Sequence, residues 1–262
     1  MTLIEVDNLN VRMSSADGSE VHAVRDVSFR IDAGQQLALV GESGCGKSTT
    51  LMSLMGLLPP TATVSGSVII DGVDVFRAPE AKLAALRWRT VSMIFQASSN
   101  PLNPVRTLGH QLRSVLEFHR MQGDDISARV LELIDMVRLP SGSEQLYPHQ
   151  LSGGMRQRAV IALALSCNPK ILLADEPTTA LDPLIQAEIL DLMLGLCERL
   201  GLALVLVTHD LPLVHRITGR AAVMHAGAIV ETGEAKVLMR TPRHPYLKRL
   251  IAAIPQAEGV ET

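Results

Sequence analysis

Residues 37–58 read LALVGESGCGKSTTLMSLMGLL, and this stretch decides the fold of the chain. Its first four residues predict a short buried strand, and a helix is expected over Lys47–Leu58, ended by Pro59-Pro60. The glycine-rich loop between them fits the pattern G-x-x-x-x-G-K-[ST] from Gly41 to Ser48. Glycines permit a tight turn whose backbone N–H groups face inward, and the helix presents its positive end to the same point. The stretch therefore predicts a binding site for the phosphates of a nucleotide.

The side chains of this loop have the chemistry that a phosphate site needs. Lys47 is expected to contact the β and γ phosphates, and the Ser48 hydroxyl to bind Mg²⁺. Cys45 lies inside the loop and is a candidate reactive thiol, but we favour the interpretation that it is a small filler residue. A chance glycine-rich turn is disfavoured because both the preceding strand and the following helix are predicted.

Two adjacent carboxylates follow a second apolar run, in ILLADE. The run puts Asp175 at the exit of a buried strand, where its carboxylate can hold Mg²⁺ through water. Glu176 would then lie beside the γ-phosphate and orient or deprotonate the attacking water. Consecutive carboxylates also end ordinary strands, so this interpretation depends on the phosphate loop in the same chain.

Two further polar residues follow strand-like runs. His209 ends LALVLVTH, and Gln96 follows a strand expected over 91–95. Alone, each is more typical of a structural histidine or of a polar strand terminus. Their weight comes from the other motifs, among them LSGGM at 151–155, which directly precedes a predicted helix.

The rest of the chain alternates between strand and helix patterns, which predicts an α/β fold with a parallel sheet and helices on its faces. From 97 to 148 helical periodicity dominates, which predicts a helical insertion between two parts of the core. Further strands are expected over 3–11, 23–31, 68–70 and 203–208, a hairpin at Asp71-Gly72, and helices over 155–167 and 183–200.

Composition narrows the possible partners. The apolar runs are much shorter than the roughly 18 residues of a membrane span, and MTLIEVDNLN does not resemble a signal peptide. We therefore expect a soluble, intracellular chain. A net charge of −3 and scattered basic residues argue against nucleic acid as a partner. Cys45, Cys167 and Cys197 form no CxxC pair, which favours a reducing cytoplasm.

In this order, the motifs resemble those of the ATP-binding subunit of ABC transporters, over essentially the whole chain. GESGCGKS matches the Walker A motif, ILLADE the Walker B motif with its catalytic glutamate, and LSGGM the family signature. TTALD, ending at Asp182, matches the D-loop, Gln96 the Q-loop and His209 the switch histidine. The resemblance implies a P-loop NTPase core with an N-terminal antiparallel β subdomain and an inserted helical subdomain.

The resemblance also implies a division of the chain and a shared site. Residues 1–96 with 155–235 would form the RecA-like core and the β subdomain, 97–154 the helical subdomain, and 236–262 a short tail. Two subunits would pack head to tail, with ATP between one Walker A motif and the other subunit's signature loop. The implied nucleotide contacts are Gly41, Glu42, Ser43, Gly44, Cys45, Gly46, Lys47, Ser48, Thr49, Gln96, Ser152, Gly153 and Gly154. The implied catalytic residues are Lys47, Glu176 and His209, and the implied Mg²⁺ ligands are Ser48, Gln96 and Asp175.

Three details resemble one subgroup, the importers of oligopeptides, dipeptides and nickel. They are QASSNPLNP from Gln96, Met155 in the signature, and TPRHPYLKRLIAAIP from Thr241. The subgroup implies hydrolysis of ATP to drive import of di- or oligopeptides, with nickel or a metallophore as the alternative cargo. It implies two membrane permeases, an extracytoplasmic binding protein, and a second ATPase, either a copy or a paralogue. The chain would lie at the cytoplasmic face of the plasma (inner) membrane.

The chain departs from the subgroup in two respects. Many members continue into a cysteine-containing extension that holds an iron–sulfur cluster, whereas no cysteine follows Cys197, so we predict no cluster. The family usually stacks an aromatic residue on adenine from a loop near 14–24, but no Phe, Tyr or Trp precedes Phe29. His22 is the candidate substitute.

Other functions of the superfamily fit less well. A soluble ATPase acting on DNA would carry long heptad repeats between Walker A and the signature, and ribosome-acting members usually carry two ATPase units. A degenerate subunit that binds ATP without hydrolysing it is disfavoured because Glu176 and His209 are present. An exporter is disfavoured by the separate ATPase chain and the tail.

Overall fold

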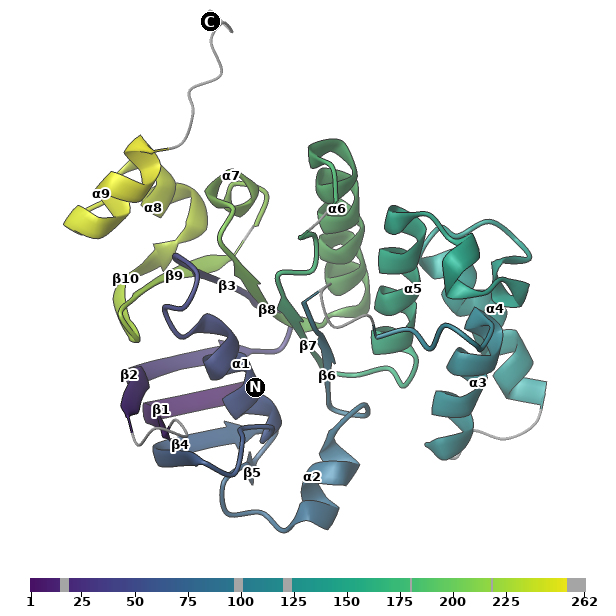
Figure 1. Cartoon of the computed structure of the whole chain (residues 1–262), viewed down its shortest axis with the longest axis horizontal. Helices are drawn as coiled ribbons and strands as arrows, with labels where there is room; N and C mark the ends of the chain where they lie inside the picture. Colours follow the sequence, from purple (N-terminus) through teal and green to yellow (C-terminus); the bar gives the residue numbers. More distant parts are fainter. Residues whose placement is uncertain (15–18, 97–100, 120–123, 180, 218, 254–262) are drawn as a thin grey trace, which may run out of the picture.

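The computed structural model describes residues 1–14, 19–96, 101–119, 124–179, 181–217 and 219–253. It contains two sheets, with helices packed on them and a group of helices to one side (Figure 1). The six-stranded sheet has the order β10-β9-β3-β8-β7-β6. Its strands are β3 (Gln36–Val40), β6 (Val91–Ile94), β7 (Ile171–Asp175), β8 (Ala203–Thr208), β9 (Arg220–His225) and β10 (Ala228–Glu234).

Most of this sheet is parallel, as the alternation of strands and helices predicted. β3 pairs in parallel with β8 and β9, and β7 with β6 and β8, while β10 runs antiparallel to β9. Every residue of β7 and β8 is buried. Continuous apolar strands such as these are typical of parallel sheets covered on both faces.

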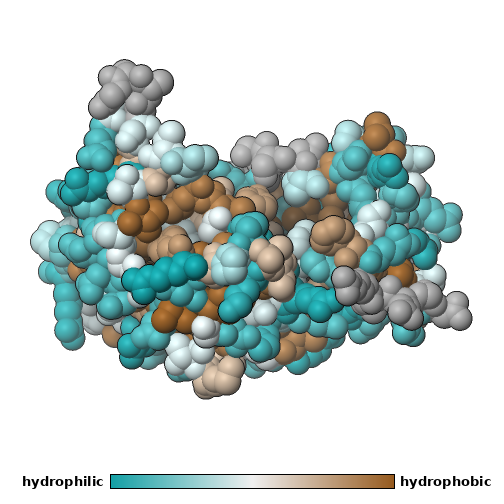
Figure 2. Space-filling view, turned by 90° about the horizontal axis from the view of Figure 1, so that it is seen from below, coloured by the Kyte–Doolittle hydropathy of each residue, from teal (hydrophilic) through white to brown (hydrophobic). Residues whose placement is uncertain are grey.

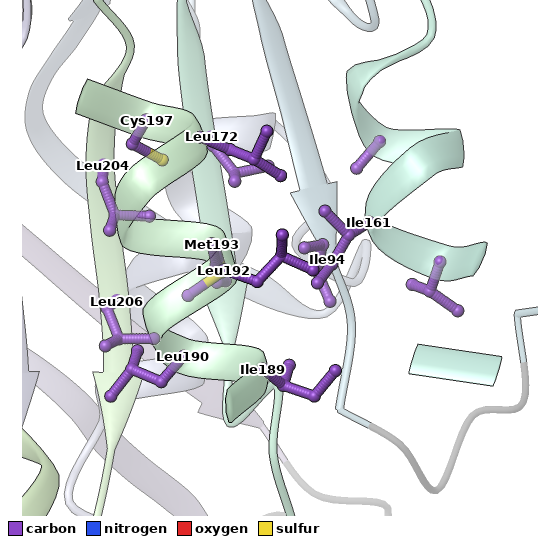
Figure 3. Close-up of a cluster of buried hydrophobic side chains, with 14 of the residues drawn as sticks. Ile94, Ile161, Leu172, Ile189, Leu190, Leu192, Met193, Cys197, Leu204 and Leu206 are labelled. Atoms are coloured by element: carbon purple, nitrogen blue, oxygen red, sulfur yellow. The ribbon is translucent and has the colours of Figure 1, made fainter. Parts of the chain in front are cut away.

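Alternate side chains of the strands enter two different hydrophobic clusters. Leu172, Leu204 and Leu206 pack with α5 (Gly153–Leu165) and α6 (Pro183–Leu200) on one face. Figure 3 shows this cluster, in which Ile189, Leu192 and Met193 of α6 lie among residues of the sheet and of α5. Leu173, Val205 and Val207 belong to the other cluster, with residues of α1 (Lys47–Met55). Because successive side chains of a strand point to opposite faces, both faces of the sheet are covered by hydrophobic packing.

The second sheet is antiparallel and has the order β2-β1-β4-β5. It comprises β1 (Thr2–Ser14), β2 (Glu20–Asp32), β4 (Ala62–Ile70) and β5 (Val73–Asp74). β4 and β5 form the hairpin expected at Asp71-Gly72, where both residues have positive φ, 48° and 80°. The buried residues of the antiparallel sheet belong to the same hydrophobic cluster as those of α1, and this packing attaches the sheet to the core.

The segment after Gln96 contains the helices that the sequence predicted there. It contains α3 (Leu108–Phe118), α4 (Asp124–Met136) and the short 3₁₀ turns Ser143–Gln145 and Pro148–Gln150. Five apolar residues that recur at helical spacing in and directly after α4 are all buried, namely Ile126, Val130, Leu133, Ile134 and Val137. Arg129 of α4 is buried too, and its guanidinium donates to the carbonyl of Leu165 and to the side chain of Asn168.

Several predicted bounds were wrong. α1 ends at Met55 rather than Leu58, because Gly56 adopts the left-handed conformation. Its N–H donates to the carbonyls of Met52 and Ser53 in the last turn of the helix. Pro59-Pro60 therefore lies beyond the helix end. α5 covers Gly153–Leu165 instead of 155–167, since Ser152 caps its first turn, and β4 begins six residues before Val68.

The remaining helices complete the chain. They are α2 (Glu80–Leu86), α7 (Leu211–Val214), α8 (Ala235–Arg240) and α9 (Pro245–Ala252). None of the described helices is long and apolar enough to cross a membrane. The face in Figure 2 mixes hydrophobic with hydrophilic residues.

A matched pair on α6 tests the packing of the core. Leu192 is 5% exposed and lies in the cluster of Figure 3, whereas Leu184 on the same helix is 69% exposed. Leu192→Ala should lower the free energy of unfolding by about 2–5 kcal/mol, because it leaves a cavity. Leu184→Ala should change it by less than about 0.5 kcal/mol. Urea denaturation measures both, and equal losses would contradict the packing.

Candidate functional site

Three polar segments meet where parallel strands end. Gly41 directly follows β3, Glu176 follows β7, and His209 follows β8. The last residue of β3, Val40, is paired with Thr208 of β8, and the last residue of β7, Asp175, is paired with Val207 of β8. Because the strands are adjacent and parallel, their carboxyl ends lie at the same edge of the sheet. The register thus brings together residues that lie more than a hundred positions apart in the sequence.

The glycine-rich loop is closely packed against its neighbours. Gly46 has a φ of 104°, and a Cβ atom there would lie 2.3 Å from the carbonyl oxygen of Ala23 on β2. Within the described chain, the backbone N–H groups of Gly44, Gly46, Lys47 and Ser48 donate to no acceptor. These groups lie at the start of α1, where the helix dipole is positive, so the loop fits an anion such as a phosphate.

Lys47 is the buried cation of the loop, at 4% exposure. Its Nζ donates to the carbonyl oxygens of Gly41 at 2.8 Å and Glu42 at 2.7 Å. It also approaches Cys45 Sγ at 3.7 Å. Burial raises the pKa of the Cys45 thiol, and Lys47 only partly offsets this. A thiol that stays protonated is unreactive, which favours the filler interpretation of Cys45.

Ser48 and Asp175 come together beside this loop. The Ser48 hydroxyl donates to Asp175 Oδ1 at 3.0 Å. Burial raises the pKa of Asp175, the hydrogen bond from Ser48 lowers it, and the charge of Glu176 raises it again. A cation at this point would stabilise the buried carboxylate. A hydroxyl and one carboxylate next to a phosphate site form a donor set that suits Mg²⁺.

The carboxylate of Glu176 is the point where the other candidates converge. Its Oε1 lies 2.9 Å from His209 Nδ1, and its Oε2 accepts from Gln96 Nε2 and from Thr179 Oγ1, both at 3.1 Å. The Glu176 backbone has a φ of 46° and its N–H donates to the carbonyl of Val207. This carboxylate is therefore fixed in direction, as a group that orients a water must be.

Two cavities border these residues. One, of about 320 Å³, is lined by Ser43, Gly44 and residues 46–49 of the loop, by Gln96 and Glu176, and by β2 residues that include His22. His22 Nε2 lies 3.0 Å from Asn10 Oδ1. The other, of about 460 Å³, is lined by Gly41, Glu42, Glu176 and His209 among others. Ser43, Gln96 and Glu176 line both cavities, so both open onto the same group of residues.

Sequence reasoning missed one part of the first cavity, the turn between β9 and β10. Ala226 and Gly227 line the cavity, and the Gly227 N–H donates to the carbonyl of Cys45 at 3.1 Å. The Gly227 carbonyl in turn accepts from the N–H of Arg25. The only signal was the glycine after an alanine, a common turn pattern that carries no chemistry of its own.

The signature residues lie elsewhere. Ser152 caps α5, since its hydroxyl accepts from the Met155 N–H at 3.2 Å. Gly153 faces Leu181, just before α6, and Gly154 faces Ile185 in its first turn; added Cβ atoms would meet them at 3.2 Å and 3.0 Å. The described linings of the two cavities do not include these residues. Within one chain, the structure does not bring residues 152–154 to the phosphate loop.

A phosphate-binding loop between a central parallel strand and a helix, with carboxylates at the end of a parallel strand two positions away in the sheet, defines a P-loop nucleotide hydrolase. Residues 24–179 match the family model described as ABC transporter. The chain belongs to the ABC transporter family, and it is an ATPase.

Curated proteins and solved structures agree with this assignment. The chain is 43% identical to the oligopeptide transport ATP-binding protein OppD of Haemophilus influenzae, over 99% of this chain and 81% of that protein. It is also 43% identical to the dipeptide transport ATP-binding protein DppD of Bacillus subtilis, over 98% of this chain and 78% of that protein. The dimeric structure of the ATP-binding cassette MJ0796 with ADP and Pi superposes with a TM-score of 0.78, at 30% identity, covering 89% of this chain and 99% of that one.

Two glycines of the loop give a matched test of its packing. Gly44 and Gly46 both have positive φ, but a Cβ at Gly44 would meet nothing within 4 Å. Gly44→Ala should lower the free energy of unfolding by about 1–2 kcal/mol through backbone strain alone. Gly46→Ala should cost more, because its Cβ must also displace the backbone of β2 at Ala23. Thermal denaturation without nucleotide compares the two, and an equal loss would argue against this packing.

Proposed function

We propose that this chain is the energy-coupling subunit of a binding-protein-dependent importer of di- or oligopeptides. The convergence of Gln96 and His209 on the Glu176 carboxylate, beside the phosphate loop, carries the proposal that ATP is hydrolysed at Glu176. The peptide cargo is supported by the names of the relatives, which are oligopeptide and dipeptide transport proteins. Nickel, the alternative that the sequence left open, has no such support among these relatives.

Lys47 and the start of α1 are proposed to bind the phosphates. Lys47 now donates to two uncharged carbonyls, whereas phosphate oxygens carry negative charge, so attraction between the opposite charges would add to the hydrogen bond. Binding would therefore turn the Lys47 ammonium from the Gly41 and Glu42 carbonyls toward the β and γ phosphates. The flanking loop residues, from Gly41 to Thr49, would contribute N–H groups and hydroxyls.

Ser48, Asp175 and Gln96 are proposed to hold Mg²⁺. Bound there, the ion would neutralise part of the negative charge that develops on the phosphates during hydrolysis. Glu176 is proposed to orient the attacking water and accept its proton, with His209 and Gln96 holding the carboxylate in place. The single direction in which Glu176 is held would make the water's approach to the γ-phosphate specific.

The site is proposed to be shared between two chains. Ser152, Gly153 and Gly154 lie away from the phosphate loop of their own chain, and the N-terminus of α5 fits a phosphate of another chain. The related cassette MJ0796 is a dimer, which supports this assembly. The partner would be a copy of this chain or a paralogous ATPase.

The division of the chain is proposed to follow these tasks. Residues 1–96 and 155–235 would bind the nucleotide, residues 97–154 would contact two membrane permeases, and residues 236–262 would form the tail. Closure on ATP and reopening after hydrolysis would reach the permeases through the helical part. The chain would act at the cytoplasmic face of the plasma (inner) membrane, with an extracytoplasmic binding protein supplying the cargo and no nucleic acid involved.

Glu176→Gln separates nucleotide binding from hydrolysis. The amide keeps the shape of the side chain but cannot accept the water's proton, so kcat should fall by about 100-fold or more while ATP affinity is kept. The variant should accumulate as an ATP-bound dimer in gel filtration. Lys47→Ala should instead weaken binding itself.

Exposed residues provide the controls for this pair. Glu198→Gln and Lys236→Ala should leave both turnover and nucleotide affinity unchanged, because neither side chain lies at the site. Wild-type turnover in Glu176→Gln would remove this carboxylate from the chemistry. Unchanged ATP affinity in Lys47→Ala would remove the loop from phosphate binding.

The chain should discriminate little between the adenine and guanine bases of its nucleotide. The described lining of the cavity beside the loop includes His22 but no Phe, Tyr or Trp, so stacking on the base is limited. ATP and GTP should therefore bind with similar affinity, and His22→Ala should weaken both alike. Competition binding with the two nucleotides measures this. A strong preference for ATP that His22→Ala abolishes would contradict the prediction.

A further inference from the structure

The C-terminal helix α9 reaches the phosphate loop, although the sequence separates them by about 200 residues. Tyr246, on the first turn of α9, is 3% exposed. Its hydroxyl accepts a hydrogen bond of 3.1 Å from the backbone N–H of Glu42. Glu42 is the second residue of the loop, directly after Gly41. A side chain from the tail thus holds a peptide group of the loop.

The ring of Tyr246 makes a second contact that leads to the same loop. It stacks on His225, with ring centroids 4.0 Å apart and an interplanar angle of 28°. His225 ends β9 and precedes the turn at Ala226-Gly227. The N–H of Gly227 in this turn donates to the carbonyl of Cys45. The tail therefore supports the loop at Glu42 directly, and at Cys45 through this turn.

The start of α9 is itself fixed to the sheet. The carboxylate of Glu231 on β10 accepts from the N–H groups of Arg243 and His244, at 3.0 Å and 2.8 Å. His244 then caps α9, because its Nδ1 accepts from the N–H of Tyr246. These bonds set the position of the Tyr246 backbone, so its hydroxyl is held against the loop rather than free to turn away.

The opposite side of the same peptide group is held by Lys47. The Glu42 N–H donates to Tyr246, and the carbonyl of the same peptide group, that of Gly41, accepts from Lys47 Nζ at 2.8 Å. When Lys47 turns to the phosphates, as proposed above, the Gly41 carbonyl of this peptide group loses that donor. The bond to Tyr246 then remains to hold this part of the loop in its turn.

We infer that Tyr246 is a positioning residue for the phosphate loop, through which the C-terminal helix sets the affinity of the chain for nucleotide. The inference rests on the proposed function, because it requires that this loop binds phosphates. Leu250, one helical turn after Tyr246, lines the cavity that also contains Glu42, Glu176 and His209. The same face of α9 thus borders the loop and the catalytic candidates.

Three variants of the full chain test the inference. Tyr246→Phe removes the hydroxyl and keeps the ring on His225, whereas Tyr246→Leu removes both contacts. Tyr147→Phe is the matched control, because Tyr147 is the other tyrosine of the chain and is 40% exposed. The measurements are the Kd for fluorescently labelled ATP and GTP with Mg²⁺, the KM and kcat of ATP hydrolysis, and the unfolding midpoint without nucleotide.

Tyr246→Phe should raise Kd and KM about three- to tenfold, which corresponds to one net hydrogen bond, and change kcat less than twofold. The factor should be the same for ATP and GTP, because the loop binds phosphates and not the base. Tyr246→Leu should raise Kd further, and Tyr147→Phe should match the wild type.

The failures of the two proposals look different. If Tyr246→Phe lowers the unfolding midpoint while Kd and KM stay within twofold of the wild type, Tyr246 is only structural and the inference is overturned. If the loss differs between ATP and GTP, the contact acts on the base and the inference is also overturned. If the wild-type chain binds neither nucleotide, the proposed function itself fails.

Discussion

The parallel pairing of β3 with β8, and of β8 with β7, is the constraint on which the rest of the structure depends. It aligns Val40 with Thr208 and Asp175 with Val207, so the residues that follow each strand begin at one edge. The phosphate loop, Glu176 and His209 are then neighbours without any contact of their own being required to bring them together. Their hydrogen bonds refine an arrangement that the backbone register has already made.

The apolar packing on both faces of this sheet is what makes such an edge rigid. β7 and β8 are buried along their whole length, between α1 on one side and α5 with α6 on the other. Buried polar groups at their ends are costly unless they are paired. Asp175 is paired with Ser48, Lys47 with two carbonyls, and Glu176 with three side chains. In the proposed function, phosphates would replace the carbonyls as partners of Lys47, and Mg²⁺ would join Ser48 and Asp175.

The sequence predicted the parts of the site whose signals are local. A glycine-rich loop after an apolar strand, and carboxylates or a histidine at the ends of other apolar strands, are read directly from neighbouring residues. The predicted end of α1 at Leu58 was wrong, because the proline pair at 59–60 is the stronger helix-stop signal in the sequence. In the structure the left-handed Gly56 ends the helix first. The turn at Ala226-Gly227 and the contact of Tyr246 with Glu42 could not be predicted. Both depend on which distant segments the fold places together, and the Tyr246 bond joins residues 204 positions apart.

The central claim is that this edge of the sheet is half of an ATP site, completed by a signature loop from a second chain in a membrane complex. The most direct test is the structure of the assembly that the Glu176→Gln chain forms with MgATP in the membranes of its native host. The account predicts two ATPase chains on two permeases, with each γ-phosphate between Lys47 and His209 of one chain and residues 152–154, or their counterparts, of the other. ATP enclosed by a single chain, with residues 152–154 facing solvent, would contradict it.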